Sequence, residues 1–351
     1  MRFSENPLIR KEDIKPSLPD LIVECVLNPG AFRFQDKIWL ILRVAERPHQ
    51  IVGTVSVPII NSIGAMEILT FDQDDPLLDL SDARLVKYDN VTYLSTISHL
   101  RLLSSDDGIH FSNPRTIPTI LFGQGELETF GIEDCRVCEI DNTYYLTYTQ
   151  VSENGVGVGL MSTTDCMIFK RLGMILPPHN KDCCLFPEKI NNRYVALHRP
   201  SGIDIGGNFI WTAYSPDLIH WGDHRCILKT RPGHWDSARV GAGASPILTE
   251  YGWLEIFHGA DFNHKYSLGA ILLEKDDPSQ VIYRSLSPLM EPTEHYELNG
   301  FFGNVIFTNG HIVDGDELLL YYGASDEVIC GAKFSIAQIL NDLMQPQNKI
   351  N

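Results

Sequence analysis

The segment Ser215-Pro216-Asp217-Leu218-Ile219-His220-Trp221 follows an apolar run and places an Asp four residues before an aromatic residue. The same spacing occurs in Asp107-Gly108-Ile109-His110-Phe111 and in Asp165-Cys166-Met167-Ile168-Phe169, at intervals of 58 and 52 residues. Ser or Thr precedes each Asp within two residues. We interpret each Asp as closing a turn through its side chain, and each aromatic residue as packing between repeats. Repeats of this length that carry several short strands are typical of β-propeller blades.

Short runs rich in aromatic and branched residues lie between turn clusters, which predicts an all-β chain. They include residues 37–42, 144–148, 194–197, 253–257 and 318–322. A helical period appears only near the end, so we predict a short C-terminal helix at about residues 335–345. The repeat length predicts a single five-bladed β-propeller over residues 1–351, with an N-terminal arm at about residues 1–20.

The chain is acidic, with 45 Asp and Glu against 28 Lys and Arg and a formal charge of −17. This charge repels phosphate backbones, so nucleic acid is not an expected partner. No apolar run is long enough for a signal peptide or a membrane span, so we expect a cytoplasmic protein that does not bind a membrane. We therefore interpret the eight cysteines as reduced thiols. The alternative is a metal or redox role for Cys135 and Cys138.

Charged residues lie at the ends of several predicted strands. A strand with only a structural role would not be expected to carry charged residues at these positions. Any one of them could form a structural ion pair, but matching positions in successive repeats favour a common site on the propeller axis. These segments are residues 40–48, 131–137, 197–200, 235–243, 257–261 and 321–326. The glycine-rich segment around Gly241 and Gly243 is not a phosphate loop, because it lacks the Gly-Lys-Ser/Thr ending and no helix follows.

These segments resemble glycoside hydrolase family 130. The resemblance runs in order from about residue 6 to about residue 335, through residues 28–31, 42–45, 131–136, 186–188, 198–200, 241–243, 253–259 and 322–326. It implies a five-bladed propeller and an inverting β-mannoside phosphorylase that releases α-mannose 1-phosphate. It implies no cofactor and no metal, with inorganic phosphate as co-substrate. Because family members are often oligomers, we also consider a homodimer.

The resemblance also assigns roles to particular residues. Asp134 is the implied general acid, which passes its proton through the 3-hydroxyl of the mannose. The implied phosphate-binding residues are Lys181, Arg199, Arg239, His258 and Tyr266. The implied substrate-binding residues are Asn28, Arg43, Glu133, Arg136 and Asp326.

The basic residues favour phosphorolysis over hydrolysis, because an attacking phosphate needs cations to hold it, whereas water needs a carboxylate base. Residues 43–48 look more like the family members that act on β-1,2-linked mannobiose or mannooligosaccharides. A β-1,4-mannosyl-glucose or β-1,4-mannosyl-N-acetylglucosamine phosphorylase and a β-1,2-mannosidase remain alternatives. A carbohydrate-binding propeller and a structural interaction propeller are the alternatives that are not enzymes.

Overall fold

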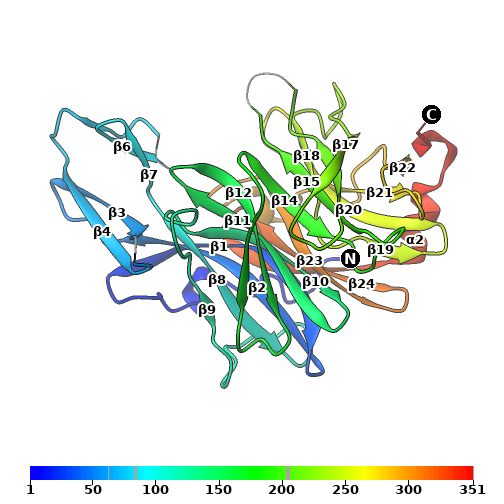
Figure 1. Cartoon of the computed structure of the whole chain (residues 1–351), viewed down its shortest axis with the longest axis horizontal. Helices are drawn as coiled ribbons and strands as arrows, with labels where there is room; N and C mark the ends of the chain where they lie inside the picture. Colours follow the sequence, from blue (N-terminus) through cyan, green and yellow to red (C-terminus); the bar gives the residue numbers. More distant parts are fainter. Residues whose placement is uncertain (62, 83–84, 203–205, 351) are drawn as a thin grey trace.

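Strands make up most of the chain in the computed structural model, which describes residues 1–61, 63–82, 85–202 and 206–350 (Figure 1). Within these residues, five larger antiparallel sheets follow one another along the chain, and two small sheets lie in an insertion at residues 49–96. The two α-helices of the described residues are short, α1 (His295–Leu298) and α2 (Ile336–Leu343). The all-β prediction is therefore confirmed, and α2 lies where the closing helix was predicted.

The first three larger sheets have four strands each. The first contains β1 (Leu21–Phe34), β2 (Lys37–Pro48), β8 (Ile97–Ser105) and β9 (Ile120–Leu121). The second contains β10 (Ile132–Ile140), β11 (Thr143–Ser152), β12 (Gly155–Thr163) and β13 (Lys170–Leu176). The third contains β14 (Asn180–Leu185), β15 (Tyr194–Pro200), β16 (Ile210–Ser215) and β17 (Gly222–Leu228).

The last two larger sheets are built in the same way, each from strands joined by tight turns. The fourth contains β18 (Arg239–Gly241), β19 (Ile247–Thr249), β20 (Gly252–Ala260), β21 (Tyr266–Leu273) and β22 (Val281–Arg284). The fifth contains β23 (Ile306–Asp314), β24 (Glu317–Ala324) and β25 (Val328–Ser335). Two 3₁₀ turns lie near the ends of the chain, at Lys11–Asp13 and Pro346–Asn348.

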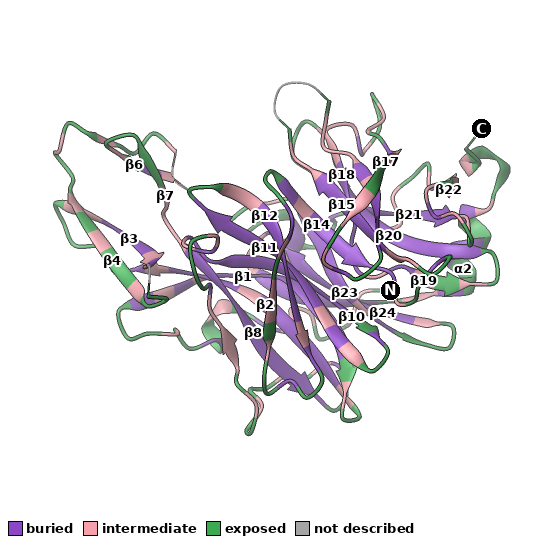
Figure 2. Cartoon of the chain, in the orientation of Figure 1, coloured by how far each residue is buried: buried purple, intermediate pink, exposed green. Residues whose placement is uncertain are grey.

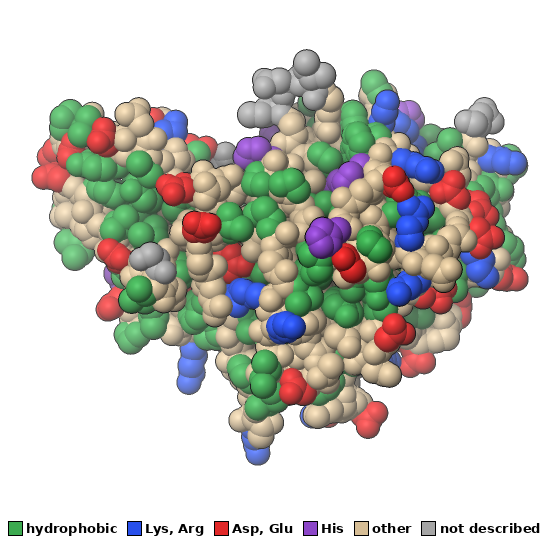
Figure 3. Space-filling model, in the orientation of Figure 1, with side chains coloured by type: hydrophobic (Ala, Val, Ile, Leu, Met, Phe, Trp, Pro, Cys, Tyr) green, Lys and Arg blue, Asp and Glu red, His purple; other side chains and the backbone are tan. Residues whose placement is uncertain are grey.

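The insertion interrupts the first sheet between β2 and β8 and projects from the body of the molecule, at the left of Figure 1. Its strands are β3 (Thr54–Ile60), β4 (Met66–Asp72), β5 (Leu78–Asp79), β6 (Leu85–Tyr88) and β7 (Val91–Leu94). Hydrophobic side chains gather on this projection in Figure 3, and the exposed ones include Ile51, Val52 and Ile63. Nothing in the repeat pattern indicated this insertion.

The repeated Asp-aromatic segments form the predicted turns. Oδ1 of Asp217 accepts hydrogen bonds from the backbone N–H groups of Ile219 and His220, at 2.9 and 2.8 Å. Asp107 and Asp165 close their turns in the same way. These side chains replace backbone partners that a turn leaves unsatisfied. The turns are therefore structural, as the sequence predicts.

Each aromatic residue of the repeat packs between its own sheet and the preceding one. Trp221 of the third sheet packs against a buried cluster that also contains residues of the second sheet. Phe169 of the second sheet joins a cluster with residues of the first. Phe111 of the first sheet lies against Tyr321 of the fifth, with ring centroids 5.7 Å apart. The first sheet thus follows the fifth as each other sheet follows its predecessor, which closes the ring.

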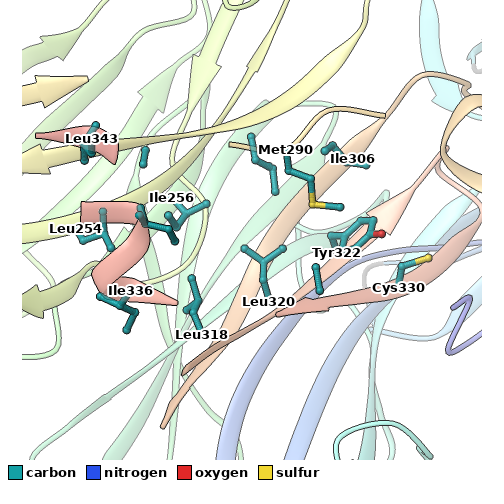
Figure 4. Packing of buried hydrophobic residues seen from close by; sticks show 14 of the residues in the cluster. Leu254, Ile256, Met290, Ile306, Leu318, Leu320, Tyr322, Cys330, Ile336 and Leu343 are labelled. Atoms are coloured by element: carbon teal, nitrogen blue, oxygen red, sulfur yellow. The ribbon is translucent and has the colours of Figure 1, made fainter. Parts of the chain in front are cut away.

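Buried apolar side chains fill the spaces between successive sheets, as the purple strands of Figure 2 show. Figure 4 shows the cluster between the fourth and fifth sheets, where Ile256 of β20 approaches Leu318 and Leu320 of β24 and α2 supplies Ile336 and Leu343. Apolar side chains therefore fill the space beside the innermost strand of each sheet. The polar side chains of that strand can meet those of the other sheets only near the axis.

The N-terminal segment completes the fifth sheet. The backbone N–H groups of Phe3 and Leu8 donate to the carbonyl oxygens of Gly331 and Ile329 on the free edge of β25, at 2.9 and 2.8 Å. The Arg2 guanidinium also binds the buried Glu297 carboxylate of α1, with Nε 2.6 Å from Oε1. The beginning and the end of the chain are thus held together in one sheet.

Candidate active site

Polar side chains from all five larger sheets meet at one cavity of about 230 Å³. Its lining contains three aspartates and an asparagine together with four basic side chains, and it also includes three phenylalanines. The lining residues are Asn28, Arg43, Asp134, Lys181, Asp182, Arg199, Arg239, Tyr266, Phe301, Phe302, Val305, Phe307 and Asp326. Residues that are far apart in the sequence therefore form a single mixed acidic and basic site.

A β-bulge places a polar residue of the innermost strand in each of the first three sheets. Asn28, Asp134 and Asp182 lie where the pairing register shifts in β1, β10 and β14. All three have positive φ, at 40°, 47° and 50°. Asn and Asp tolerate this conformation better than most residues, and a bulge redirects the side chain out of the regular alternation. The repeated bulge thus turns three equivalent side chains toward the axis.

The Asp134 carboxylate is held by side chains of the first sheet. Asn28 Nδ2 donates to Asp134 Oδ1 at 3.0 Å, and Arg43 Nη1 lies 3.4 Å from the same oxygen. Arg43 Nη2 also donates to Glu133 Oε1 at 2.8 Å. Burial raises the pKa of Asp134, but the charges of Arg43 and Arg136 outweigh it, so its pKa lies below the usual value. Asp134 is therefore ionised in the unliganded site.

Arg136 lies behind the cavity and joins the two central aspartates. Its Nη1 donates to the backbone oxygen of Asp134 at 3.0 Å, and its Nη2 donates to Asp182 Oδ1 at 3.2 Å. The remaining donors reach the backbone oxygens of Ala242 and Gly243. The Arg136 side chain is 2% exposed, and its nitrogens are engaged in these contacts. Arg136 therefore supports the two aspartates and does not face the cavity.

The Asp182 carboxylate is the centre of the basic half of the site. It is 1% exposed, and its Oδ2 lies 2.9 Å from Arg199 Nη2 and 3.2 Å from His258 Nε2. Burial raises the pKa of Asp182, but the charges of Arg199 and Arg136 and the contact with His258 hold it well below the usual value. Burial lowers the pKa of His258 to about 4, so this imidazole is neutral at pH 7.

Several buried donors at the cavity have no hydrogen-bond partner within the part of the chain that the structure describes. They are Nε and Nη1 of Arg199 and Nε of Arg239. Arg239 Nη1 in turn donates to the Tyr266 hydroxyl at 2.7 Å. Unsatisfied buried donors of a cation are costly, and they suit an oxyanion that accepts from several of them. This side of the cavity can therefore bind a phosphate-like anion.

Asp326 lines the cavity from the turn between β24 and β25. Burial raises its pKa to about 6, and the nearby Asp134 and Glu133 charges add to the effect while Arg43 opposes it. Because it titrates close to neutral pH, Asp326 can accept or donate a hydrogen bond to a ligand hydroxyl.

The structure brings the predicted site residues together, with one distinction. Asn28, Arg43, Asp134, Lys181, Arg199, Arg239, Tyr266 and Asp326 line the cavity. Glu133, Arg136 and His258 are not among its lining residues and lie behind it, in contact with residues that are. His258 is 0% exposed and is stacked on Phe307 at 4.1 Å between ring centroids.

Sequence reasoning missed Asp182 and the phenylalanines at positions 301, 302 and 307. A signal for Asp182 was present, because Lys181-Asp182-Cys183 repeats the pattern of Glu133-Asp134-Cys135. Both triplets carry the bulge of an innermost strand. Phe301 and Phe302 are 56% and 39% exposed beside the cavity, and no pattern distinguishes them from ordinary loop residues.

The eight cysteines are all free thiols, and seven of them are buried. Burial raises the pKa of Cys138 to about 12, which leaves it a poor nucleophile and a poor metal ligand. In residues 1–61, 63–82, 85–202 and 206–350, no group of three His, Cys, Asp or Glu side chains is arranged to hold a metal ion. The same residues contain no helix of the length and apolarity needed to cross a membrane.

Comparison with known proteins explains this combination of fold and site. The all-β fold is shared with a solved family-43 glycoside hydrolase at a TM-score of 0.56 and 13% identity. The 42% identical relatives are phosphorylases, which makes the chain a carbohydrate-active enzyme. A family model described as β-1,4-mannooligosaccharide phosphorylase matches residues 81–345. The chain belongs to glycoside hydrolase family 130.

Two relatives of this chain are phosphorylases. A β-1,2-mannobiose phosphorylase of Listeria innocua serovar 6a is 42% identical over 97% of this chain and 98% of its own length. A 1,2-β-oligomannan phosphorylase of Thermoanaerobacter sp. is 42% identical over 68% of this chain and 78% of its own. The solved complex of the Listeria innocua enzyme with β-1,2-mannobiose has a TM-score of 0.92, with 42% identity and coverage of 97% and 98%.

Proposed function

We propose that the chain is an inverting β-mannoside phosphorylase that cleaves β-1,2-mannobiose or a β-1,2-mannooligosaccharide with inorganic phosphate. The products are α-mannose 1-phosphate and the shortened sugar. The observation that carries the proposal is a pair of buried Arg199 nitrogens that have no hydrogen-bond partner within the described part of the chain, in a cavity shared with Lys181 and Arg239. Water needs no such cationic cradle, whereas an attacking phosphate does. The phosphorylase relatives at 42% identity support the same activity.

Phosphate is the co-substrate in this proposal, and no cofactor takes part. Lys181, Arg199 and Arg239 hold the anion on one side of the anomeric carbon, with Tyr266 supporting Arg239. His258 does not line the cavity and lies with its Nε2 3.2 Å from Asp182 Oδ2. Attack from this side, opposite the leaving sugar, inverts the anomeric configuration.

Asp134 is the proposed general acid, acting through the 3-hydroxyl of the mannose. In the unliganded site its pKa is low because Arg43 and Arg136 are close. A phosphate dianion bound nearby would raise this pKa, since a like charge disfavours the carboxylate. Proton uptake by Asp134 is therefore coupled to phosphate binding. Asp134 carries the proton that it donates only when phosphate, the nucleophile, is bound.

The remaining polar residues suit the mannosyl group. Asn28, Arg43 and Asp326 line the cavity, and each can hydrogen-bond a sugar hydroxyl. The cavity of about 230 Å³ is smaller than the usual range of about 300–1,000 Å³ for drug-sized ligands. It fits one mannosyl group and phosphate, so the leaving sugar extends past the exposed Phe301 and Phe302.

The architecture that we propose is one domain with five blades, one for each larger sheet. The support is that successive sheets pack through shared apolar clusters and that the first packs on the fifth. We also propose a homodimer. The apolar side chains of Ile51, Val52 and Ile63 on the insertion, at 70%, 102% and 85% exposure, are a surface that a second subunit would cover.

Incubation with β-1,2-mannobiose, with and without phosphate, tests the activity. We expect mannose 1-phosphate only when phosphate is present. Free mannose without phosphate would instead identify a β-1,2-mannosidase, and no turnover would favour a carbohydrate-binding propeller. Reverse synthesis from mannose 1-phosphate over a panel of acceptors, with analysis of the linkage formed, separates a β-1,2 from a β-1,4 phosphorylase.

A further inference from the structure

Asp182 combines features that the proposed reaction leaves unexplained. It is an ionised carboxylate inside the part of the site that should attract an anion, and it is 1% exposed. Its backbone has φ of 50° at a bulge, a conformation that costs free energy for a residue other than glycine. A charge and a conformation of this kind persist only where the surrounding contacts require them.

The contacts of Asp182 divide between its two oxygens. Oδ1 accepts from Arg136, which also holds the backbone of Asp134. Oδ2 pairs with Nη2 of Arg199 and lies beside His258. Arg199 is thus ion-paired through one nitrogen, and its Nε and Nη1 are buried with no hydrogen-bond partner among the residues that the structure describes. The ion pair leaves these two donors available to an anion in the cavity.

The backbone next to this contact leaves no room for adjustment. A Cβ at position 241 would lie 2.4 Å from Asp182 Oδ2 and 2.4 Å from His258 Nε2. Gly241 therefore lets the carboxylate and the imidazole approach β18. The arrangement of Asp182, Arg199 and His258 is packed from three strands at once, which is what a positioning contact needs.

We propose that Asp182 is the positioning residue of the phosphate site, which orients Arg199 toward the anion and connects it through Arg136 to the proposed acid Asp134. This inference rests on the proposed phosphorylase function. Asp182 touches neither the sugar nor the transferred proton, so it acts through its arginine partners. Its negative charge opposes phosphate binding in part, and the gain from orienting Arg199 must exceed that cost.

The substitution Asp182→Asn tests the proposal because it keeps the shape and removes the charge. The Asn amide has one oxygen and one NH₂ group. Its oxygen can accept a hydrogen bond from either Arg136 or Arg199, and its NH₂ group then faces the donors of the other arginine. We expect KM for phosphate to rise at least tenfold in the forward direction. In reverse synthesis, KM for mannose 1-phosphate should rise by a similar factor. KM for mannobiose and for the acceptor mannose should stay within about twofold.

A matched control separates positioning from general destabilisation. Glu128 is also 1% exposed and binds an arginine, with Oε2 3.1 Å from Arg171 Nη2, but it does not line the cavity. Glu128→Gln should lower thermal stability as Asp182→Asn does and leave KM for phosphate unchanged. Equal changes in every KM for Asp182→Asn would overturn the proposal and assign it a structural role.

A second comparison remains informative if Asp182→Asn does not fold. Arg199→Gln is compared with the double variant Asp182→Asn/Arg199→Gln, in which both charges of the pair are removed. If Asp182 acts through Arg199, the double variant should have the same KM for phosphate as Arg199→Gln. A further tenfold rise in the double variant would contradict the proposal. A wild-type enzyme that needs no phosphate would instead contradict the proposed function itself.

Discussion

Asn28 Nδ2 and Asp134 Oδ1 lie 3.0 Å apart, although 106 residues separate them in the chain. Each is the positive-φ residue of a bulge in the innermost strand of its sheet. The contact therefore joins equivalent positions of two repeats, and Asp182 occupies the equivalent position in the third. A repeated backbone irregularity, rather than a loop, brings the chemistry of the site to the axis.

The substitution Asp134→Asn should lower turnover by roughly 10²- to 10⁴-fold, the range ascribed to general acid catalysis, because it removes the transferable proton. Initial rates of phosphorolysis and of reverse synthesis measure the loss. Glu133→Gln is the comparison, because Glu133 also pairs with Arg43 but does not line the cavity. It should cost less. Near-normal turnover in Asp134→Asn would remove this residue from the catalytic role.

The substitution Arg199→Ala should lower kcat/KM for phosphate by roughly ten- to a hundredfold, because a charge-assisted contact is worth about 1.5–3 kcal/mol. Arg239→Ala should behave alike. KM for the mannoside should change little in either variant. Arg225→Ala removes an arginine with a 54% exposed side chain from the third sheet and serves as the control. An unchanged KM for phosphate with loss of disaccharide binding would assign the basic residues to the sugar.

The raised pKa of Asp326 predicts a pH-dependent penalty on stability. Burial raises this pKa from its usual value of 3.8 to about 6, so the folded protein holds the proton more tightly than the unfolded chain. The resulting stability is complete below about pH 4 and is lost as the pH rises through about 6. Asp326→Asn should therefore be more stable than the wild type at pH 7.5, by about 1–3 kcal/mol, and less active.

Thermal unfolding from pH 4 to 8 measures the Asp326 effect. The difference in melting temperature between Asp326→Asn and the wild type should vanish at the acidic end. Substitution of the exposed Asp74 by Asn removes the same formal charge and should show no such pH dependence. An Asp326→Asn protein that is less stable than the wild type at every pH would contradict the prediction.

The substitution Gly241→Ala should impair the phosphate site without removing a charged group. The new methyl group would lie 2.4 Å from both Asp182 Oδ2 and His258 Nε2, and both side chains are buried. We expect kcat/KM for phosphate to fall at least tenfold, with destabilisation of about 1–3 kcal/mol. Gly222→Ala is the matched control, because no atom lies within 4 Å of a Cβ there. Equal effects of the two substitutions would exclude a specific role for Gly241.

The sequence predicted the repeated turns well because they are local. The Asp that closes each turn and the aromatic residue behind it lie within five positions, and the packing of Phe111, Phe169 and Trp221 follows the order of the sheets. The insertion at residues 49–96 was not predicted, because its strands add to no repeat and leave the spacing of the turns unchanged.

The site was predicted mainly through the family resemblance, and the limits of that prediction are physical. A cavity-lining residue such as Arg199 carries a charge at a strand end, which a sequence can show. The bulges that rotate Asp134 and Asp182 inward depend on pairing with neighbouring strands, and pairing is not visible in a single strand. For the same reason, the sequence could not separate the cavity-lining Lys181 from the enclosed His258.

The pairing of residues 3–9 with β25 has a consequence for biosynthesis. A ribosome makes these residues more than 300 residues before their partner strand at residues 328–335. The ring therefore cannot close until that strand has emerged, and the earlier sheets must wait with one flank uncovered. Contacts between such distant segments form slowly, because the loop between them must be closed first. Closure is expected to be the slow step of maturation, and the stage at which the nascent protein is most exposed to aggregation or to chaperones.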